Sequence, residues 1–292
     1  MARKNKIVNP ESHPMGDILR MDRMPHIWCS GCGLGTAMTA FVEGLKLAGA
    51  DYNSTVVVSG IGCTARIAGY IKLDSYHTTH GRAIPFATGI KLANQDLKVV
   101  VFSGDGDLFA IGGNHLIHAA RRNVDLTVIC VNNFIYGMTG GQNAPTTPIS
   151  AYSSTAPYGN CEEPFNLVGI AASAGASYVA RWTALHTRRL SESVSTAFKR
   201  KGFSFIEVVS PCPTVYARKN RGGTGLDLLK EFAGRSVIDH TADPTKIPLD
   251  MDGKIVCGEF VNIEKPTFWD TVQAGLKKRF PNIYLEKKHM EE

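Results

Sequence analysis

The fold is decided by residues 98–106, KVVVFSGDG, together with residues 126–133, LTVICVNN. In each stretch a short block rich in Val and Ile gives way abruptly to polar residues. Short blocks of β-branched residues that end in turn residues predict buried strands of a parallel sheet. Residues 113–123 predict a helix that crosses between the two strands, so both polar ends are expected at the same edge of the sheet.

The polar residues at these strand ends, Asp105 and Asn133, predict a metal site. Ligands of an open parallel sheet bind in the crevice at the carboxyl ends of its strands. A carboxylate, an amide oxygen and a backbone carbonyl suit Mg²⁺, which usually keeps substrate phosphates in its coordination shell. Each motif alone is common turn chemistry, so the prediction of a Mg²⁺ ion bridging to a diphosphate depends on their combination.

This combination resembles the diphosphate-binding motif of thiamine diphosphate enzymes, which begins with GDG and ends in an Asn or an Asn pair. The segment NNFIYGMTGGQ, residues 132–142, is similar to the corresponding segment of 2-oxoacid:ferredoxin oxidoreductases. The resemblance implies that Asp105, the Asn133 side chain and the Ile135 carbonyl are the Mg²⁺ ligands. The residues that it implies for thiamine diphosphate binding are Gly104, Asp105, Gly106, Asn133, Ile135, Gly137, Thr139, Cys63 and His80.

The cysteines form a second group of candidate ligands. The chain has seven, and its N-terminus is polar with no apolar segment behind it, which predicts a reduced, cytoplasmic protein without a disulfide framework. Residues 28–33, WCSGCG, form a C-x-x-C loop, while Cys63 and Cys212 each follow a strand-like run. Four thiolates that meet at strand ends match a [4Fe–4S] cluster, and tetrahedral zinc is the alternative.

The order WCSGCG, GIGC and SPC resembles the β-subunits of 2-oxoacid:ferredoxin oxidoreductases over roughly residues 25–220. The resemblance implies that Cys29, Cys32, Cys63 and Cys212 hold the [4Fe–4S] cluster. Their dispersed spacing favours iron–sulfur over zinc, because structural zinc sites usually consist of two close pairs. Cys130 lies within an apolar run and is expected to be a small core residue.

The family resemblance implies an enzyme, in which thiamine diphosphate supports decarboxylation of a 2-oxoacid and a nearby cluster takes up the electrons. The stretch HTTHGRAIPFATG, residues 77–89, is similar to that of 2-oxoglutarate enzymes. The implied reaction is CoA-dependent conversion of 2-oxoglutarate to succinyl-CoA and CO₂, reversible, with ferredoxin as the electron carrier. Pyruvate and branched-chain 2-oxoacids are the alternative substrates.

Three residues are candidates for catalysis or substrate recognition. Arg66 is a candidate clamp for a substrate carboxylate, because a guanidinium binds a carboxylate through two hydrogen bonds. A single Arg is otherwise often a solvated surface residue. His80 and Arg82 follow in the HGR segment, where His80 is suited to acid–base chemistry or to hydrogen bonding with cofactor or substrate.

One part of the cofactor site is expected from another chain. Related enzymes take the Glu that activates the aminopyrimidine from a separate pyrimidine-binding domain, and 292 residues leave room for one such α/β domain with extensions. We therefore predict an obligate α-subunit that carries this Glu, in an (αβ)₂ assembly. The predicted division is an N-terminal arm (1–27), a domain for thiamine diphosphate and the cluster (28–219), and a C-terminal extension that packs on the partner (220–292).

The predicted fold class is a three-layer α/β fold with a parallel sheet of the thiamine diphosphate-binding type. Two other classes of function remain as alternatives: a noncatalytic subunit that relays electrons or is stapled by zinc, and a nucleotide-binding redox enzyme, whose G-x-G-x-x-G loop the chain lacks. A formal charge of +6, the absence of a nucleic-acid-binding module and the absence of a membrane-length apolar stretch predict neither nucleic acid nor membrane as a partner. Further expected elements are helices at 35–50, 83–94 and 165–175 and an ordered loop over the active site at 143–157.

Overall fold

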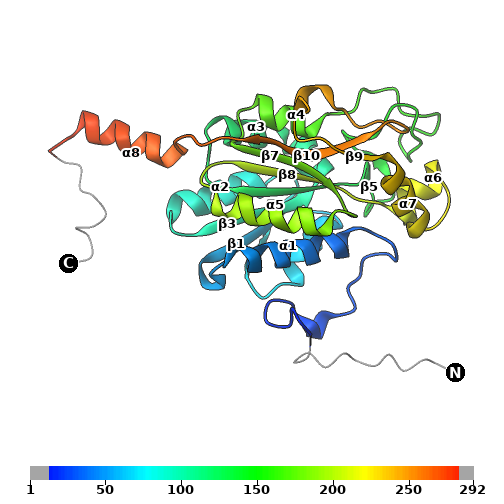
Figure 1. Ribbon diagram of the computed structural model, residues 1–292, viewed down its shortest axis with the longest axis horizontal. Helices are drawn as coiled ribbons and strands as arrows, with labels where there is room; N and C mark the ends of the chain where they lie inside the picture. The colour runs from blue at the N-terminus through cyan, green and yellow to red at the C-terminus, as the bar shows by residue number, and fades with distance from the viewer. Residues whose placement is uncertain (1–12, 283–292) are drawn as a thin grey trace.

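An eight-stranded sheet forms the centre of the computed structural model, which describes residues 13–282 (Figure 1). Its strand order is β2-β1-β3-β4-β8-β7-β10-β9, and all neighbours are parallel except β10, which runs antiparallel to β7. This arrangement confirms the predicted fold class. The strands are β1 (Thr55–Ser59), β2 (Asp74–His77), β3 (Lys98–Gly104), β4 (Thr127–Asn132), β7 (Tyr178–Thr183), β8 (Ser204–Val209), β9 (Ser236–Ile238) and β10 (Ile255–Asn262), with a separate hairpin of β5 (Ile135–Tyr136) and β6 (Gln142–Asn143).

Helices cover both faces of the sheet. On one face α1 (Leu34–Ala48) packs beside α5 (Thr187–Lys199), and residues of α2 (Ala83–Ala93), α3 (Gly113–Arg121) and α4 (Leu167–Ser173) form the core on the other face. The four predicted helices among these lie within two residues of the observed bounds. After β8 come the helices α6 (Arg218–Asn220), α7 (Gly225–Arg235) and α8 (Phe268–Arg279), the last of which extends away from the sheet in Figure 1.

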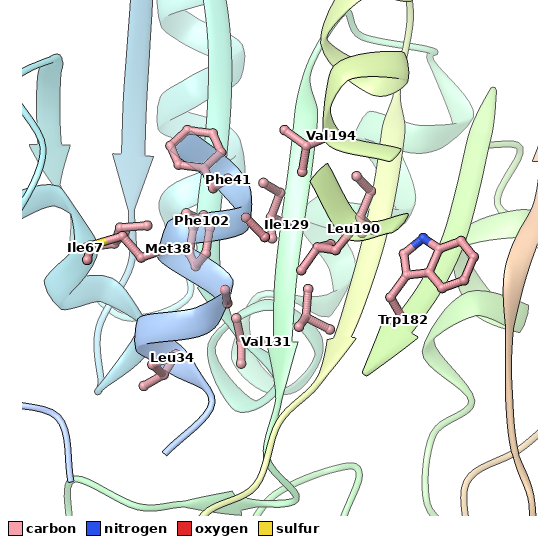
Figure 2. Close-up of a cluster of buried hydrophobic side chains, with 14 of the residues drawn as sticks. Leu34, Met38, Phe41, Ile67, Phe102, Ile129, Val131, Trp182, Leu190 and Val194 are labelled. Carbon is pink, nitrogen blue, oxygen red and sulfur yellow. The ribbon is translucent and has the colours of Figure 1, made fainter. Parts of the chain in front are cut away.

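The alternation of side chains along the strands explains the continuous apolar runs. Phe102 of β3 faces the layer of α1 and α5, while its neighbour Val101 faces the opposite layer. Because both faces are covered, every position of the central strands must be apolar or hydrogen-bonded. Phe41 of α1 meets Phe102 edge-on with a distance of 5.6 Å between the ring centroids. Figure 2 shows this layer of the core, with Leu34, Met38, Phe41, Ile67, Phe102, Ile129, Val131, Trp182, Leu190 and Val194 labelled.

Several elements have no counterpart among the sequence expectations. The strands β2 and β7 lie within the predicted domain, whereas β9 and β10 come from the segment expected to be an extension, so part of residues 220–292 belongs to the main sheet. Residues 1–12 of the expected arm and residues 283–292 of the expected extension lie outside the described residues. Within residues 13–282, no helix has the length and apolar character needed to cross a membrane.

Candidate cofactor site

Asp105 lies where β3 ends and a π-helical turn, Gly106–Ile111, begins. Its side chain is buried, and the Thr146 hydroxyl donates a hydrogen bond to its Oδ2 atom. Burial raises the pKa of Asp105 to about 7, and the bond from Thr146 only partly offsets this effect. A buried carboxyl group of this kind fits a cation site, because a bound divalent ion would favour its charged form. Thr146 belongs to the loop expected over the active site, and this contact puts the loop against the predicted metal ligand Asp105.

Asn133 follows β4 in a sharp turn. The next residue, Phe134, has a φ of 65°, a left-handed conformation that is uncommon outside glycine. Asn133 accepts a hydrogen bond from the Ile135 backbone N–H at 3.4 Å, and the Phe134 carbonyl accepts one from the Thr147 hydroxyl at 2.7 Å. The turn brings Asn133 and Ile135 to the same cavity as Asp105.

This cavity has a volume of about 200 Å³. One wall is close-packed: a Cβ atom on Gly106 would lie 2.3 Å from the Cε1 atom of Tyr136, whose hydroxyl donates to the Gly106 carbonyl at 3.1 Å. No side chain therefore fits at Gly106 unless Tyr136 moves. All of the residues expected at the cofactor line the cavity, namely Gly104, Asp105, Gly106, Asn133, Ile135, Gly137, Thr139, Cys63 and His80.

A second carboxylate at the cavity, Asp107, was missed by the sequence analysis. Its Oδ1 atom lies 2.6 Å from the Nδ1 atom of His80 and also accepts the Gly81 backbone N–H at 2.8 Å, while its Oδ2 atom accepts the Ser103 hydroxyl at 2.7 Å. Asp107 is buried, whereas the His80 side chain is 40% exposed. The sequence signal for this residue is the second acid in GDGD, which directly follows the GDG motif.

The two candidate arginines do not line the cavity. Arg66 is exposed on a 3₁₀ segment, Thr64–Gly69, and Arg82 is exposed just before α2. Burial raises the pKa of the Cys63 thiol, and the positive charge of Arg66 partly offsets that rise. Both side chains therefore lie on segments that flank the cavity, outside its lining.

The four predicted cluster cysteines gather beside the cavity. Burial is the main cause that raises the pKa of Cys32 to about 12, and the negative charges that Cys29, Cys63 and Cys212 would carry add to it. A Cβ atom built on Gly137, which lines the cavity, would lie 3.7 Å from the Cys212 Sγ atom and 4.0 Å from the Cys63 Sγ atom. The thiols of Cys63 and Cys212 thus border the cavity at Gly137.

The spacing of these thiols differs from that of a single-ion site. Within residues 13–282, no group of three or more His, Cys, Asp or Glu residues is arranged to hold one metal ion. Zinc would need all four sulfur atoms around one centre, whereas the thiolates of a cubane cluster bind different irons. The donor set therefore fits a cluster better than the zinc alternative. Cys130, by contrast, is fully buried in the apolar core, as expected.

Comparisons with known proteins identify the family of the chain. Residues 53–208 match the family model of the thiamine pyrophosphate enzyme C-terminal TPP-binding domain. The chain is 50% identical to 2-oxoglutarate synthase subunit KorB of Methanothermobacter marburgensis, over 96% of this chain and 98% of that protein. It is also 50% identical to the KorB subunit of Methanocaldococcus jannaschii, over 91% and 98% of the two chains.

A solved structure extends the likeness to the fold. It is that of a 2-oxoglutarate:ferredoxin oxidoreductase from Magnetococcus marinus with 2-oxoglutarate, coenzyme A and succinyl-CoA bound, and it is similar with a TM-score of 0.81 at 30% identity. The match covers 98% of this chain and 95% of that one. The chain therefore belongs to the β-subunit family of the 2-oxoacid:ferredoxin oxidoreductases and carries the thiamine diphosphate-binding domain of that family.

Proposed function

We propose that the chain is the β-subunit of a 2-oxoglutarate:ferredoxin oxidoreductase. The reaction is the reversible, CoA-dependent oxidative decarboxylation of 2-oxoglutarate to succinyl-CoA and CO₂, with electrons passed through a [4Fe–4S] cluster to ferredoxin. The names of the KorB relatives and the ligands of the Magnetococcus structure support this substrate. The single observation that carries the proposal is the wall at Gly137, where the thiols of Cys63 and Cys212 border the cofactor cavity.

The proposed metal ligands are Asp105, the Asn133 side chain and the Ile135 carbonyl, which hold Mg²⁺ against the cofactor diphosphate. The raised pKa of the buried Asp105 carboxyl and the presence of all three residues at one cavity support this assignment. Thr146 donates a hydrogen bond to the Oδ2 atom of Asp105 and so helps to hold the carboxylate that would bind the ion. Thiamine diphosphate bound here supplies the chemistry that releases CO₂ from a 2-oxoacid and leaves an electron pair to be removed.

The proposed cluster ligands are Cys29, Cys32, Cys63 and Cys212. The mutual electrostatic influence of the four thiols supports this assignment. The thiols of Cys63 and Cys212 beside Gly137, at the wall of the cofactor cavity, support a cluster next to the cofactor.

His80 is the proposed catalytic residue of this chain, since it is the imidazole that lines the cavity and has its Nδ1 atom held by Asp107. Arg66 and Arg82 remain proposed contacts for the substrate carboxylates. Both are exposed cations that lie within three residues of cavity-lining positions, Cys63 and His80 respectively. A second carboxylate at the far end of 2-oxoglutarate would extend out of the cavity toward such a cation.

A partner α-subunit is proposed to complete the site, in an (αβ)₂ assembly in the cytoplasm. The cavity, at about 200 Å³, is smaller than the ~300–1,000 Å³ of typical small-molecule pockets. Two apolar residues that line it, Ile61 and Met138, are 38% and 42% exposed, as expected of a surface that another chain covers. Phe268 at the start of helix α8 packs against the core, but no residue of this helix is fully buried by the described part of this chain, which supports packing of the C-terminal segment on the partner.

The test is a substrate screen of the chain co-expressed with its partner and purified without air, followed by viologen reduction. We expect CoA-dependent turnover with 2-oxoglutarate preferred over pyruvate and branched-chain 2-oxoacids. Replacement of Arg66 by Met should raise KM for 2-oxoglutarate more than KM for pyruvate. A preference for pyruvate that this substitution leaves unchanged would remove the assignment of 2-oxoglutarate.

A further inference from the structure

A fully buried ion pair crosses two strands of the sheet. Arg181 of β7 and Glu207 of β8 are partners in register, with 2.6 Å between the Nε and Oε2 atoms, and neither side chain is exposed. Burial of such a pair costs solvation energy that the attraction only partly repays, and well-packed apolar residues are often as stable. A gain in stability therefore does not explain why this ion pair is present. The other hydrogen bonds of Arg181 and Glu207 indicate what else the pair does.

The second oxygen of Glu207 leads from the ion pair to the end of β4. Its Oε1 atom accepts a hydrogen bond from the Asn132 Nδ2 atom at 2.8 Å. The Oδ1 atom of Asn132 in turn accepts the backbone N–H of Phe134 at 3.1 Å. Both ends of the Asn132 amide are thus in use, and a continuous chain of hydrogen bonds connects Arg181 to the turn after β4.

That turn contains the left-handed residue Phe134. A residue other than glycine in this conformation is strained and persists only where its surroundings impose it. Here the restraints are the bond from Phe134 N–H to Asn132 and the bond from the Thr147 hydroxyl to the Phe134 carbonyl. The residues on either side of Phe134, Asn133 and Ile135, are the proposed Mg²⁺ ligands.

The remaining donors of Arg181 anchor the other end of the chain of bonds. Its Nη1 atom donates to the Ile247 carbonyl at 2.8 Å, and its Nη2 atom donates to the Asn166 side chain at 3.2 Å. Asn166 caps α4, and Ile247 belongs to the segment between β9 and β10. Arg181 is therefore fixed from several sides and can hold the Glu207 carboxylate in one orientation.

We infer that Glu207 and Asn132 are positioning residues of the magnesium site. The Arg181–Glu207 pair fixes Asn132, and Asn132 holds the turn that presents Asn133 and Ile135 to the ion. The inference rests on the proposed Mg²⁺–diphosphate site and adds to it residues that do not touch the metal.

The test is the substitution Asn132→Ala in the chain co-purified anaerobically with its partner subunit. The measured quantity is the Mg²⁺ concentration that gives half-maximal binding of thiamine diphosphate, followed by equilibrium dialysis at a fixed cofactor concentration. We expect it to rise about tenfold, which corresponds to ~1.4 kcal/mol. The iron content should stay at the wild-type value, because the cysteines are not part of this chain of bonds.

The matched control is Asn123→Ala. Asn123 is also buried and also uses both ends of its amide, but it lies before the start of β4, at the opposite end of that strand. Its own backbone is left-handed with φ of 52°, whereas Asn132 lies within β4. This substitution should lower the stability of the protein. The Mg²⁺ concentration for half-maximal cofactor binding should stay within about twofold of the wild-type value, which corresponds to ~0.4 kcal/mol. A rise as large in Asn123→Ala as in Asn132→Ala would overturn the inference, because any loss of stability would then produce the effect.

A second variant keeps the test decisive if Asn132→Ala does not fold. Asn132→Asp preserves the acceptor for Phe134 and the shape of the side chain, but it places a carboxylate oxygen against Glu207 in place of the amide donor. A similar rise in the Mg²⁺ concentration needed for cofactor binding in Asn132→Asp supports the inference. An unchanged Mg²⁺ concentration overturns the inference but leaves the proposed metal site standing. A wild-type complex that binds thiamine diphosphate without Mg²⁺ would instead overturn the proposed metal site, and the inference with it.

Discussion

The Nδ1 atom of His80 lies 2.6 Å from the Oδ1 atom of the buried Asp107 carboxylate. The same carboxylate accepts hydrogen bonds from the Ser103 hydroxyl and the Gly81 backbone N–H, which fix its orientation. A neutral imidazole that donates to a carboxylate through Nδ1 has its Nε2 atom as an acceptor. The two acids of GDGD therefore differ in role: Asp105 faces the proposed ion, and Asp107 orients the histidine.

The substitution Asp107→Asn should impair turnover without removing the cofactor. The amide cannot hold the His80 proton on Nδ1 as a carboxylate does, so we expect kcat for viologen reduction to fall by about 10²–10⁴, the usual contribution of a positioned acid or base. KM for the 2-oxoacid should change far less. The control is Asp51→Asn. Asp51 is an exposed residue that caps the 3₁₀ helix Tyr52–Ser54, so this variant should keep wild-type kinetics. A kcat close to wild type in Asp107→Asn would exclude the His80–Asp107 contact from turnover.

Replacement of Asp105 by Ala should separate the two cofactors. The proposed Mg²⁺ site loses its only carboxylate, so the complex should purify without thiamine diphosphate and without decarboxylase activity. The iron content should remain, since the thiols are held by other segments. Thiamine diphosphate and iron analyses of the same preparation check both statements. Decarboxylation that continues in Asp105→Ala with a bypass electron acceptor would favour the alternative of a subunit that only relays electrons.

The predicted site residues were recognisable because each follows a strand. Asp105 and Asn133 come directly after β3 and β4, Cys63 and Cys212 come within four residues of the ends of β1 and β8, and the carboxyl ends of parallel strands meet at one edge of a sheet. Local sequence was therefore sufficient to predict that these residues lie at this edge. Asp107 was missed because its partner, His80, lies on a different loop, and only the folded chain shows the contact between them.

The strands that were missed depend on partners elsewhere in the chain. In β7, YVARWT, the charge of Arg181 breaks the apolar run, and its compensation by Glu207 is visible only once β7 and β8 are in register. In β2, DSYH, no residue is fully buried, and the strand exists through its pairing with β1 at the sheet edge. Such strands have little intrinsic signal because neighbouring strands, not local propensity, stabilise them.

The cluster ligands can be separated from the other cysteines by single substitutions to Ser. We expect Cys63→Ser and Cys212→Ser to lose most of the iron and sulfide, because both thiols stand beside Gly137 at the wall of the cofactor cavity. Cys161→Ser is the matched control, since this exposed cysteine has no place in the group, and it should keep full iron content. Iron and acid-labile sulfide assays on anaerobic preparations make the comparison. Equal iron in all three variants would refute the ligand assignment.

Two glycine substitutions should have opposite effects on stability. An added Cβ atom at Gly89, which is exposed within α2, meets nothing within 4 Å, so Gly89→Ala should raise the free energy of unfolding by about 0.5–1 kcal/mol. At Gly106 the added atom would overlap the Tyr136 ring, so Gly106→Ala should lower that free energy by about 1–3 kcal/mol. Chemical denaturation of the two variants beside wild type measures both changes.

The same pair of variants tests how Ile135 is held at the metal site. Tyr136 follows Ile135 directly in β5 and bonds to the Gly106 carbonyl, so a displaced ring should shift the proposed carbonyl ligand as well. We therefore expect Gly106→Ala to weaken thiamine diphosphate binding in the presence of Mg²⁺ and Gly89→Ala to leave it unchanged. If Gly106→Ala is destabilised but binds the cofactor with wild-type affinity, Tyr136 moves independently of Ile135 and another contact must fix that carbonyl.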